Sequence, residues 1–104
     1  MTKVETLLGF AAKAGRLITG TAAVETAIRK NRVKIVICAG DLSAKTLKNF
    51  QYLCDQRSIP FYTFGTVSEI GRWIGIPGRG IIGIHSPDFA KSIGSLLNDG
   101  GDEP

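Results

Sequence analysis

Hydrophobic positions along the chain switch between helical spacing and short continuous apolar runs. Near the start, small and apolar side chains recur three and four residues apart, which is one face of a helix: Val4, Leu7, Leu8, Ala11 and Ala12. Thr2 and Glu5 have the spacing of a capping box, and Gly15 can end the helix in a left-handed conformation. We therefore predict a first helix up to Gly15, followed by a short strand at 16–19.

A second helix is predicted from Thr21 to Asn31, with Val24, Ala27 and Ile28 on its inner face. The segment 33–39 that follows is almost continuously apolar and rich in β-branched residues. Such a run is typical of a strand that is buried on both faces of a sheet.

The second half repeats this alternation. Ser43 can cap a third helix, and Thr66 to Glu69 has the capping-box spacing that opens a short helix ending before Gly75. Strands are predicted at 61–64 and 81–84, and Pro87 stands where a last helix begins. The inner faces of the third and last helices are predicted to be Leu47, Phe50, Leu53 and Cys54, and Phe89, Ile93, Leu96 and Leu97.

Helices that alternate with strands favour a sheet covered by helices on both sides. The fold expected is therefore α/β, a three-layer α-β-α sandwich with a four-stranded mixed sheet. Residues 1–98 are expected to form one domain, and 99–104 a flexible acidic tail.

Composition is consistent with a water-soluble protein. The chain is 43% hydrophobic, yet no apolar run approaches the ~20 residues of a membrane span, and its first residues lack the pattern of a signal peptide. Cys38 and Cys54 are far apart in sequence, and we expect both to be buried thiols in a reducing cytoplasm.

The distribution of charge along the chain indicates more about possible partners than the overall composition does. The net charge is +4, but three of the nine acids lie in the last six residues, so the rest of the chain holds 13 bases against six acids. A concentrated basic field attracts polyanions such as nucleic acid, although a solvated basic face would explain the same count.

Two motifs that suggest chemistry fail in context. Gly78 to Gly83 matches G-x-G-x-x-G, but it runs into a strand, whereas the dinucleotide-binding motif opens a helix. His85 is the only histidine and has no cluster of ligands around it in sequence. We therefore expect no enzymatic activity, no cofactor and no metal.

The start of the second helix is the stronger candidate. Gly20 has no side chain and small residues follow it, so the unpaired amides of the first turn could meet an anion or a carbonyl acceptor. Arg16 before the helix, and Lys30 and Arg32 after it, could flank such a partner. The alternative is an ordinary helix start that packs against its neighbours.

Several stretches in fixed order resemble one known family: AGRLITGTAAVETAIRKNRVKIVICAGDLS, LCDQRSIPFYTFGTVSEIGRWIG and, after a loop, IIGI. They resemble the kink-turn-binding ribosomal proteins, the superfamily of L7Ae and L30e, and within it the small bacterial YlxQ-type members. The resemblance covers roughly residues 4–97. It implies an α-β-α sandwich that binds structured RNA, either ribosomal or kink-turn RNA, as a cytoplasmic and ribosome-associated monomer, with ribosomal proteins as further partners.

The resemblance also implies where RNA would bind: the start of the second helix and the loop before the last strand. The positions that correspond here are Gly20, Thr21, Ala22, Ala23, Thr26, Lys30, Gly78, Arg79 and Gly80. Strong RNA binders of the family carry asparagine and glutamate at the positions of Ala22 and Ala23, and lysine at that of Thr26. Because each lost base contact costs ~1–3 kcal/mol, we expect this protein to bind kink-turn RNA more weakly than those family members do. The alternative hypothesis is a protein-interaction module that has the same fold but does not bind kink-turn RNA specifically.

Overall fold

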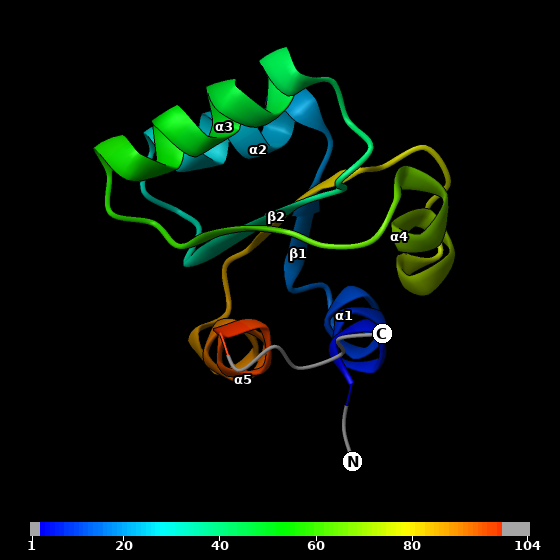
Figure 1. The fold of residues 1–104 in the computed structure, drawn as a ribbon. Coiled ribbons are helices and arrows are strands. Elements are labelled where there is room, and N and C mark those ends of the chain that lie inside the picture. The colour runs from blue at the N-terminus through cyan, green and yellow to red at the C-terminus, as the bar shows by residue number, and fades with distance from the viewer. Residues whose placement is uncertain (1–2, 99–104) are drawn as a thin grey trace.

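The computed structural model describes residues 3–98 (Figure 1). Five helices and four strands alternate along these residues. The helices are α1 (Val4–Lys13), α2 (Thr21–Arg29), α3 (Ala44–Gln56), α4 (Val67–Ile74) and α5 (Pro87–Asn98). The strands are β1 (Leu17–Thr19), β2 (Ile35–Cys38), β3 (Phe61–Thr63) and β4 (Ile81–Ile84).

The four strands form one mixed sheet in the order β1-β4-β2-β3. β4 is antiparallel to both of its neighbours, whereas β2 and β3 are parallel. Leu17 lies opposite Ile84, and Thr19 lies opposite Ile82. The predicted mixed sheet of four strands is therefore confirmed, and its order places the first strand next to the last.

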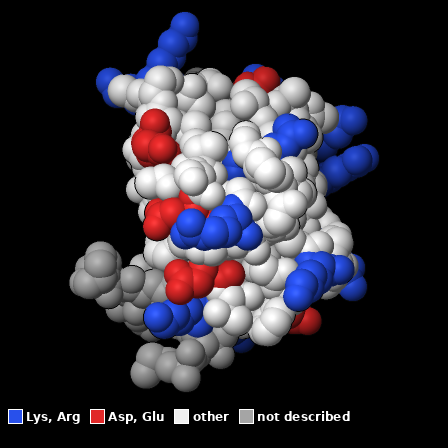
Figure 2. All heavy atoms as spheres, turned by 90° about the vertical axis from the view of Figure 1, so that its right-hand side faces the viewer, with Lys and Arg blue, Asp and Glu red and all other residues white. Residues whose placement is uncertain are grey.

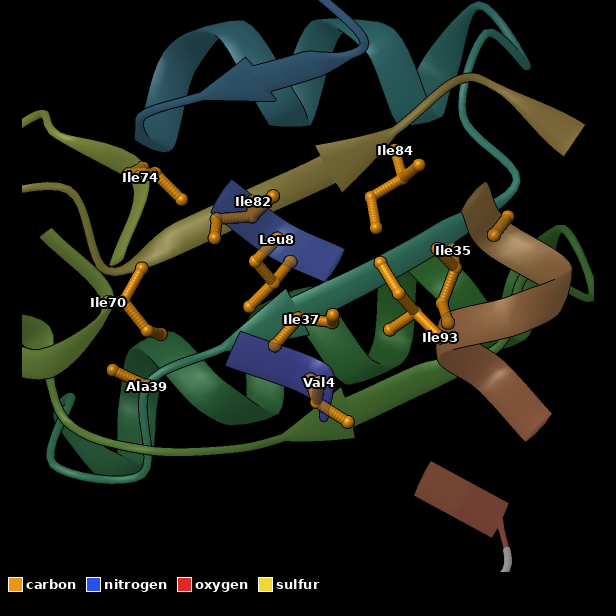
Figure 3. Packing of buried hydrophobic residues seen from close by; sticks show 11 residues of the cluster. Val4, Leu8, Ile35, Ile37, Ala39, Ile70, Ile74, Ile82, Ile84 and Ile93 are labelled. Atoms are coloured by element: carbon orange, nitrogen blue, oxygen red, sulfur yellow. The ribbon is translucent and has the colours of Figure 1, made fainter. Parts of the chain in front are cut away.

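Helices cover both faces of the sheet. Figure 1 shows α2 and α3 on one side and α1 and α5 on the other, with α4 beside α1. Side chains of β2 alternate between the two faces, so that Ile35 and Ile37 enter a core with α1, α4 and α5, while Val36 and Cys38 enter a core with α2 and α3. Figure 3 shows the first core, in which Leu8 of α1 and Ile93 of α5 pack near Ile37 and Ile35. All four residues of β2 are buried, as the apolar run predicted.

Most of the predicted helix ends are confirmed. The amide of Thr46 donates to the Ser43 hydroxyl at 3.1 Å, and Thr66 and Glu69 form both hydrogen bonds of a capping box. Gly15 and Gly75 are left-handed where their helices end.

Two predicted helix boundaries differ from the structure, and three of the strands are one to three residues shorter than predicted. Thr2 lies outside the described residues, and α1 begins at Val4 with Lys3 in the cap position and no side-chain cap. α2 ends at Arg29 rather than Asn31, because Asn31 adopts a left-handed φ of 55° that stops the helix. Asn98 is the last residue of α5, and residues 99–104 lie outside the described part.

Both cysteines are free and buried, as expected. Burial raises the pKa of Cys38 to about 12, with a smaller contribution from Cys54, and raises the pKa of Cys54 to about 11, with a smaller contribution from Asp55. The two thiols are therefore protonated at neutral pH. Among residues 3–98, no helix has both the length and the apolar character to cross a bilayer.

Candidate functional site

Gly20 turns the chain from β1 into α2. Its φ of 99° and ψ of 154° lie in a region that is almost exclusive to glycine. The amide of Gly20 donates to the carbonyl of Ile81 at 3.0 Å, and its own carbonyl accepts from the amide of Val24. The turn at Gly20 therefore fixes the position of the start of α2 relative to β4.

The first turn of α2 is open. It has neither a side-chain cap nor an acidic residue, and Thr21, Ala22 and Ala23 are all exposed. The amides of these three residues therefore have no acceptor within the helix, and they lie at the positive end of its dipole. An anion or a carbonyl oxygen could reach this backbone directly.

Arg79 lies over this helix start. One terminal nitrogen of its guanidinium is 2.7 Å from the point that a Cβ atom on Gly20 would occupy. A cation beside the positive end of a helix is electrostatically unfavourable, and the first turn of α2 has no acidic side chain to offset it. The two positive features together favour an anionic ligand.

A hollow of about 230 Å³ surrounds this contact, and four segments of the chain build it. The start of α2 contributes Gly20 and Thr21, the loop after β2 contributes Leu42, and α4 contributes Val67. The loop at 75–80 closes it with Gly78, Arg79 and Gly80, followed by Ile81. A second hollow of about 450 Å³ shares Gly78 and continues along α4.

The walls of the hollow are tied to one another. Asp41 accepts a hydrogen bond from the amide of Val67 at 2.9 Å, and the amide of Ala39 donates to the carbonyl of Gly80 at 2.7 Å. A Cβ atom on Gly80 would come within 2.7 Å of the Val67 side chain, so only glycine allows this loop to pack so closely. The loop that presents Arg79 is thereby held against α4.

Sequence reasoning missed Asp41, Leu42 and Val67. The capping box at Thr66 predicted the start of α4 but did not indicate which segments lie beside it. No local pattern reports that the loop after β2 and the start of α4 meet, because that contact depends on the pairing of strands.

The structure separates the remaining predicted site residues from the hollow. Arg16 lies at the opposite end of the sheet, where its carbonyl accepts from the amide of His85. Lys30 follows the last turn of α2, ~13 Å along the helix axis from its start, and Arg32 lies beyond it. Thr26 is exposed one turn into α2. The basic residues predicted to flank a partner therefore lie at a distance from Arg79.

The two motifs that fail in sequence context have other places in the fold. Gly80 leads into β4 and not into a helix. His85 is half-buried after β4, and the described part of the chain contains no group of three or more metal-ligating side chains around it or elsewhere.

Charges on this side of the molecule are mixed. Figure 2 views the face on which α4 lies in Figure 1, and it shows basic groups near the centre and along the right-hand margin. Acidic groups lie mainly toward the left, directly beside the central basic group, and further basic groups lie at the upper and lower left.

Comparison with known proteins identifies the family. Residues 2–93 match the model of the ribosomal protein L7Ae/L30e/S12e/Gadd45 family. The chain is 35% identical over 95 residues to the RNA-binding protein YlxQ of Enterococcus faecium, with 91% of each chain covered. It is 30% identical over 92 residues to the RNA-binding protein YlxQ of Bacillus subtilis, with 88% of this chain and 92% of that protein covered.

Solved structures agree with this relationship. A Bacillus halodurans protein of unknown function superimposes with a TM-score of 0.89 and 32% identity, over 94% of this chain and 99% of the other. The 15.5 kDa RNA-binding protein of Giardia lamblia has the same fold, with a TM-score of 0.80 at 13% identity over 92% of this chain and 82% of its own. The chain belongs to the ribosomal protein L7Ae/L30e/S12e/Gadd45 family, and within it is of the bacterial YlxQ type.

Proposed function

We propose that this protein binds structured RNA through the start of α2 and the loop at 75–80, without enzymatic activity. The observation that carries the proposal is the guanidinium of Arg79 over the open first turn of α2. The names of the two YlxQ relatives, both RNA-binding proteins, support the class of ligand.

Each part of the hollow has a role in this proposal. The amides of Thr21, Ala22 and Ala23 donate to phosphate oxygens or to acceptors on base edges, and Arg79 pairs with a phosphate. Because Gly20 has no side chain and Ala22 and Ala23 have only methyl groups, an RNA backbone can approach the helix closely. Gly80 lets the loop pack against Val67, and Gly78 adds no side chain next to Arg79.

Arg16, Thr26, Lys30 and Arg32 belong to an outer contact zone in this proposal. They lie too far from Arg79 to reach the same phosphate, so they contact neighbouring phosphates of an RNA that extends along α2 and past its end. The ligand is a kink-turn-like element of ribosomal or other structured RNA. The protein acts as a monomer in the cytoplasm, on or near the ribosome and its proteins.

The test compares two single-cation variants on one RNA. The probe is a synthetic kink-turn hairpin with two sheared G·A pairs, titrated at low salt by fluorescence anisotropy. A hydrogen bond to a charged group contributes ~1.5–3 kcal/mol, so Arg79→Ala should weaken binding about tenfold or more. Lys91→Ala removes an exposed cation of α5, far from the hollow, and should change affinity less than about twofold.

Equal effects of the two variants would mean that only overall charge matters and that the hollow is not the interface. Complete absence of RNA binding by the folded protein at low salt would favour the rival function, a protein-interaction module. Ala22 and Ala23 are the observation in favour of that rival, because they leave an exposed, uncharged helix start.

A further inference from the structure

A groove of about 530 Å³ runs between β3 and α5, away from the hollow at Arg79. Lys34 lies at one side of it, and the amide of Lys34 donates to the carbonyl of Ile84. Gly20 is bonded instead to Ile81, at the other end of the same strand. The groove and the hollow therefore lie at opposite ends of β4.

β3 is an edge strand, and its outer backbone is unpaired by the sheet. The carbonyl of Pro60 accepts from the amide of Val36, and the amide of Phe64 donates to the carbonyl of Cys38. The backbone amides and carbonyls of the even-numbered residues in this segment therefore point toward β2. Because backbone groups alternate in direction along a strand, the amides and carbonyls of Phe61 and Thr63 point away from the sheet. This edge can accept one more strand.

Side chains on one face of such an added strand would enter the groove. α5 presents small residues there, Ala90 and Gly94, and a Cβ atom on Gly94 would lie 3.5 Å from the Ile35 side chain. Tyr62 of β3 lines the opposite wall, and its hydroxyl donates a hydrogen bond to Asn98 at the end of α5. The groove is thus apolar at its base and framed by helix and strand.

Charge specifies the kind of occupant. Lys34 and Lys91 line the groove, both are exposed, and no acidic residue between 3 and 98 lines it. Neither lysine forms an ion pair with any residue between 3 and 98. An added strand with acidic side chains at alternate positions would place its carboxylates near these two cations while its backbone pairs with β3.

We propose that the edge of β3 and the groove beside α5 form a docking site for an extended acidic peptide segment of a partner protein. The segment adds a strand to β3 through Phe61 and Thr63, and its alternate acidic side chains meet Lys34 and Lys91. This site is independent of the RNA proposal, since the two surfaces share no residue.

The test selects peptides from a random library, so the sequence of the partner does not have to be specified. A displayed library of random 12-residue peptides is panned on the whole chain, and an enriched peptide is synthesised and titrated. Enriched peptides should carry several Asp or Glu residues at alternate positions, with no proline among them. Lys34→Glu with Lys91→Glu should weaken binding at least tenfold, whereas Lys45→Glu with Lys48→Glu, exposed on α3, should change it less than twofold.

A second variant tests the strand itself. Thr63→Pro removes one outward amide but no hydrogen bond of the sheet, so the fold should persist while peptide affinity falls at least threefold. Thermal melting and kink-turn RNA titration of each variant confirm that the rest of the protein is intact. The proposal is overturned if no enriched peptide depends on Lys34 and Lys91, if the enriched peptides are basic, or if Thr63→Pro has no effect.

Discussion

At the residue scale, the close approach of Arg79 to Gly20 follows from the fold and could not be predicted from the sequence. The sequence indicated that a helix start without side chains could meet an anion, and the resemblance pointed to the loop around Arg79. Neither could give the φ of 99° at Gly20 or the 2.7 Å approach of the guanidinium. Both depend on the register between β1 and β4, which joins residues far apart in the chain.

Polar side chains introduced at the start of α2 test whether RNA is recognised by backbone amides alone or also by side chains. Ala22 and Ala23 are exposed in the first turn of α2, so Ala22→Asn with Ala23→Glu should change the free energy of unfolding by only a few tenths of a kcal/mol. Kink-turn affinity should rise about tenfold or more, because one recovered base contact contributes ~1–3 kcal/mol. Titration of the same hairpin RNA measures this.

The matched control for that experiment is Ala14→Glu, which adds the same single negative charge at an exposed position after α1. It should lower affinity slightly or not at all. A folded double variant with no gain would indicate that the hollow does not present the geometry of a kink-turn site.

At the element scale, the sequence predicted best where the signal was local. Ser43 and Thr66 cap their helices as the spacing indicated, and the four apolar residues of β2 are buried on both faces. The limits of α2 were less predictable, because Asn31 stops the helix by its own left-handed conformation. The walls of the hollow were not predictable at all, since they come from segments that meet only after the sheet has formed.

Helix α4 links a local cap to the candidate site. Thr66→Ala removes the acceptor for the amide of Glu69, 3.1 Å away, and should cost ~1 kcal/mol in the free energy of unfolding. Because Val67 lines the hollow directly after this cap, RNA affinity should fall as well. Denaturant unfolding and RNA titration measure the two effects.

Thr66→Ser keeps the hydroxyl and should restore both quantities. Ser68→Ala, at an exposed position in the same turn, should leave both nearly unchanged. If Thr66→Ala destabilises the protein but leaves RNA affinity intact, the start of α4 is not part of the interface.

At the scale of the whole molecule, three of the basic residues discussed above lie at opposite ends of the sheet. Arg79 lies at one end with the hollow, while Lys34 and Arg16 lie at the other, where β4 ends. The net charge of +4 does not show this separation. The count in the sequence predicted an attraction to polyanions, but it could not predict this division.

Salt dependence tests how many of these charges RNA contacts. If Arg16, Lys30, Arg32 and Arg79 all meet phosphates, the logarithm of the association constant should fall by roughly 3 units per tenfold rise in salt, since each contact contributes ~0.7–0.9. Removing any one of the four should reduce that slope by one such increment. Lys34→Glu with Lys91→Glu should leave the slope unchanged, and a flat dependence in the unmodified protein would contradict phosphate binding altogether.

The pairing of β1 with β4 also has a consequence for a chain that is still being made. Gly20 receives its fixed position from the carbonyl of Ile81, and β1 has its strand partner only in residues 82–84. At ~5–20 residues per second, a ribosome needs several seconds to pass from one strand to the other. During that interval the nascent chain holds the residues of α2 but lacks the strand that orients them. The hollow therefore arises only after residues 81–84 have been made, and a chain that stops before them has no such site to offer to RNA.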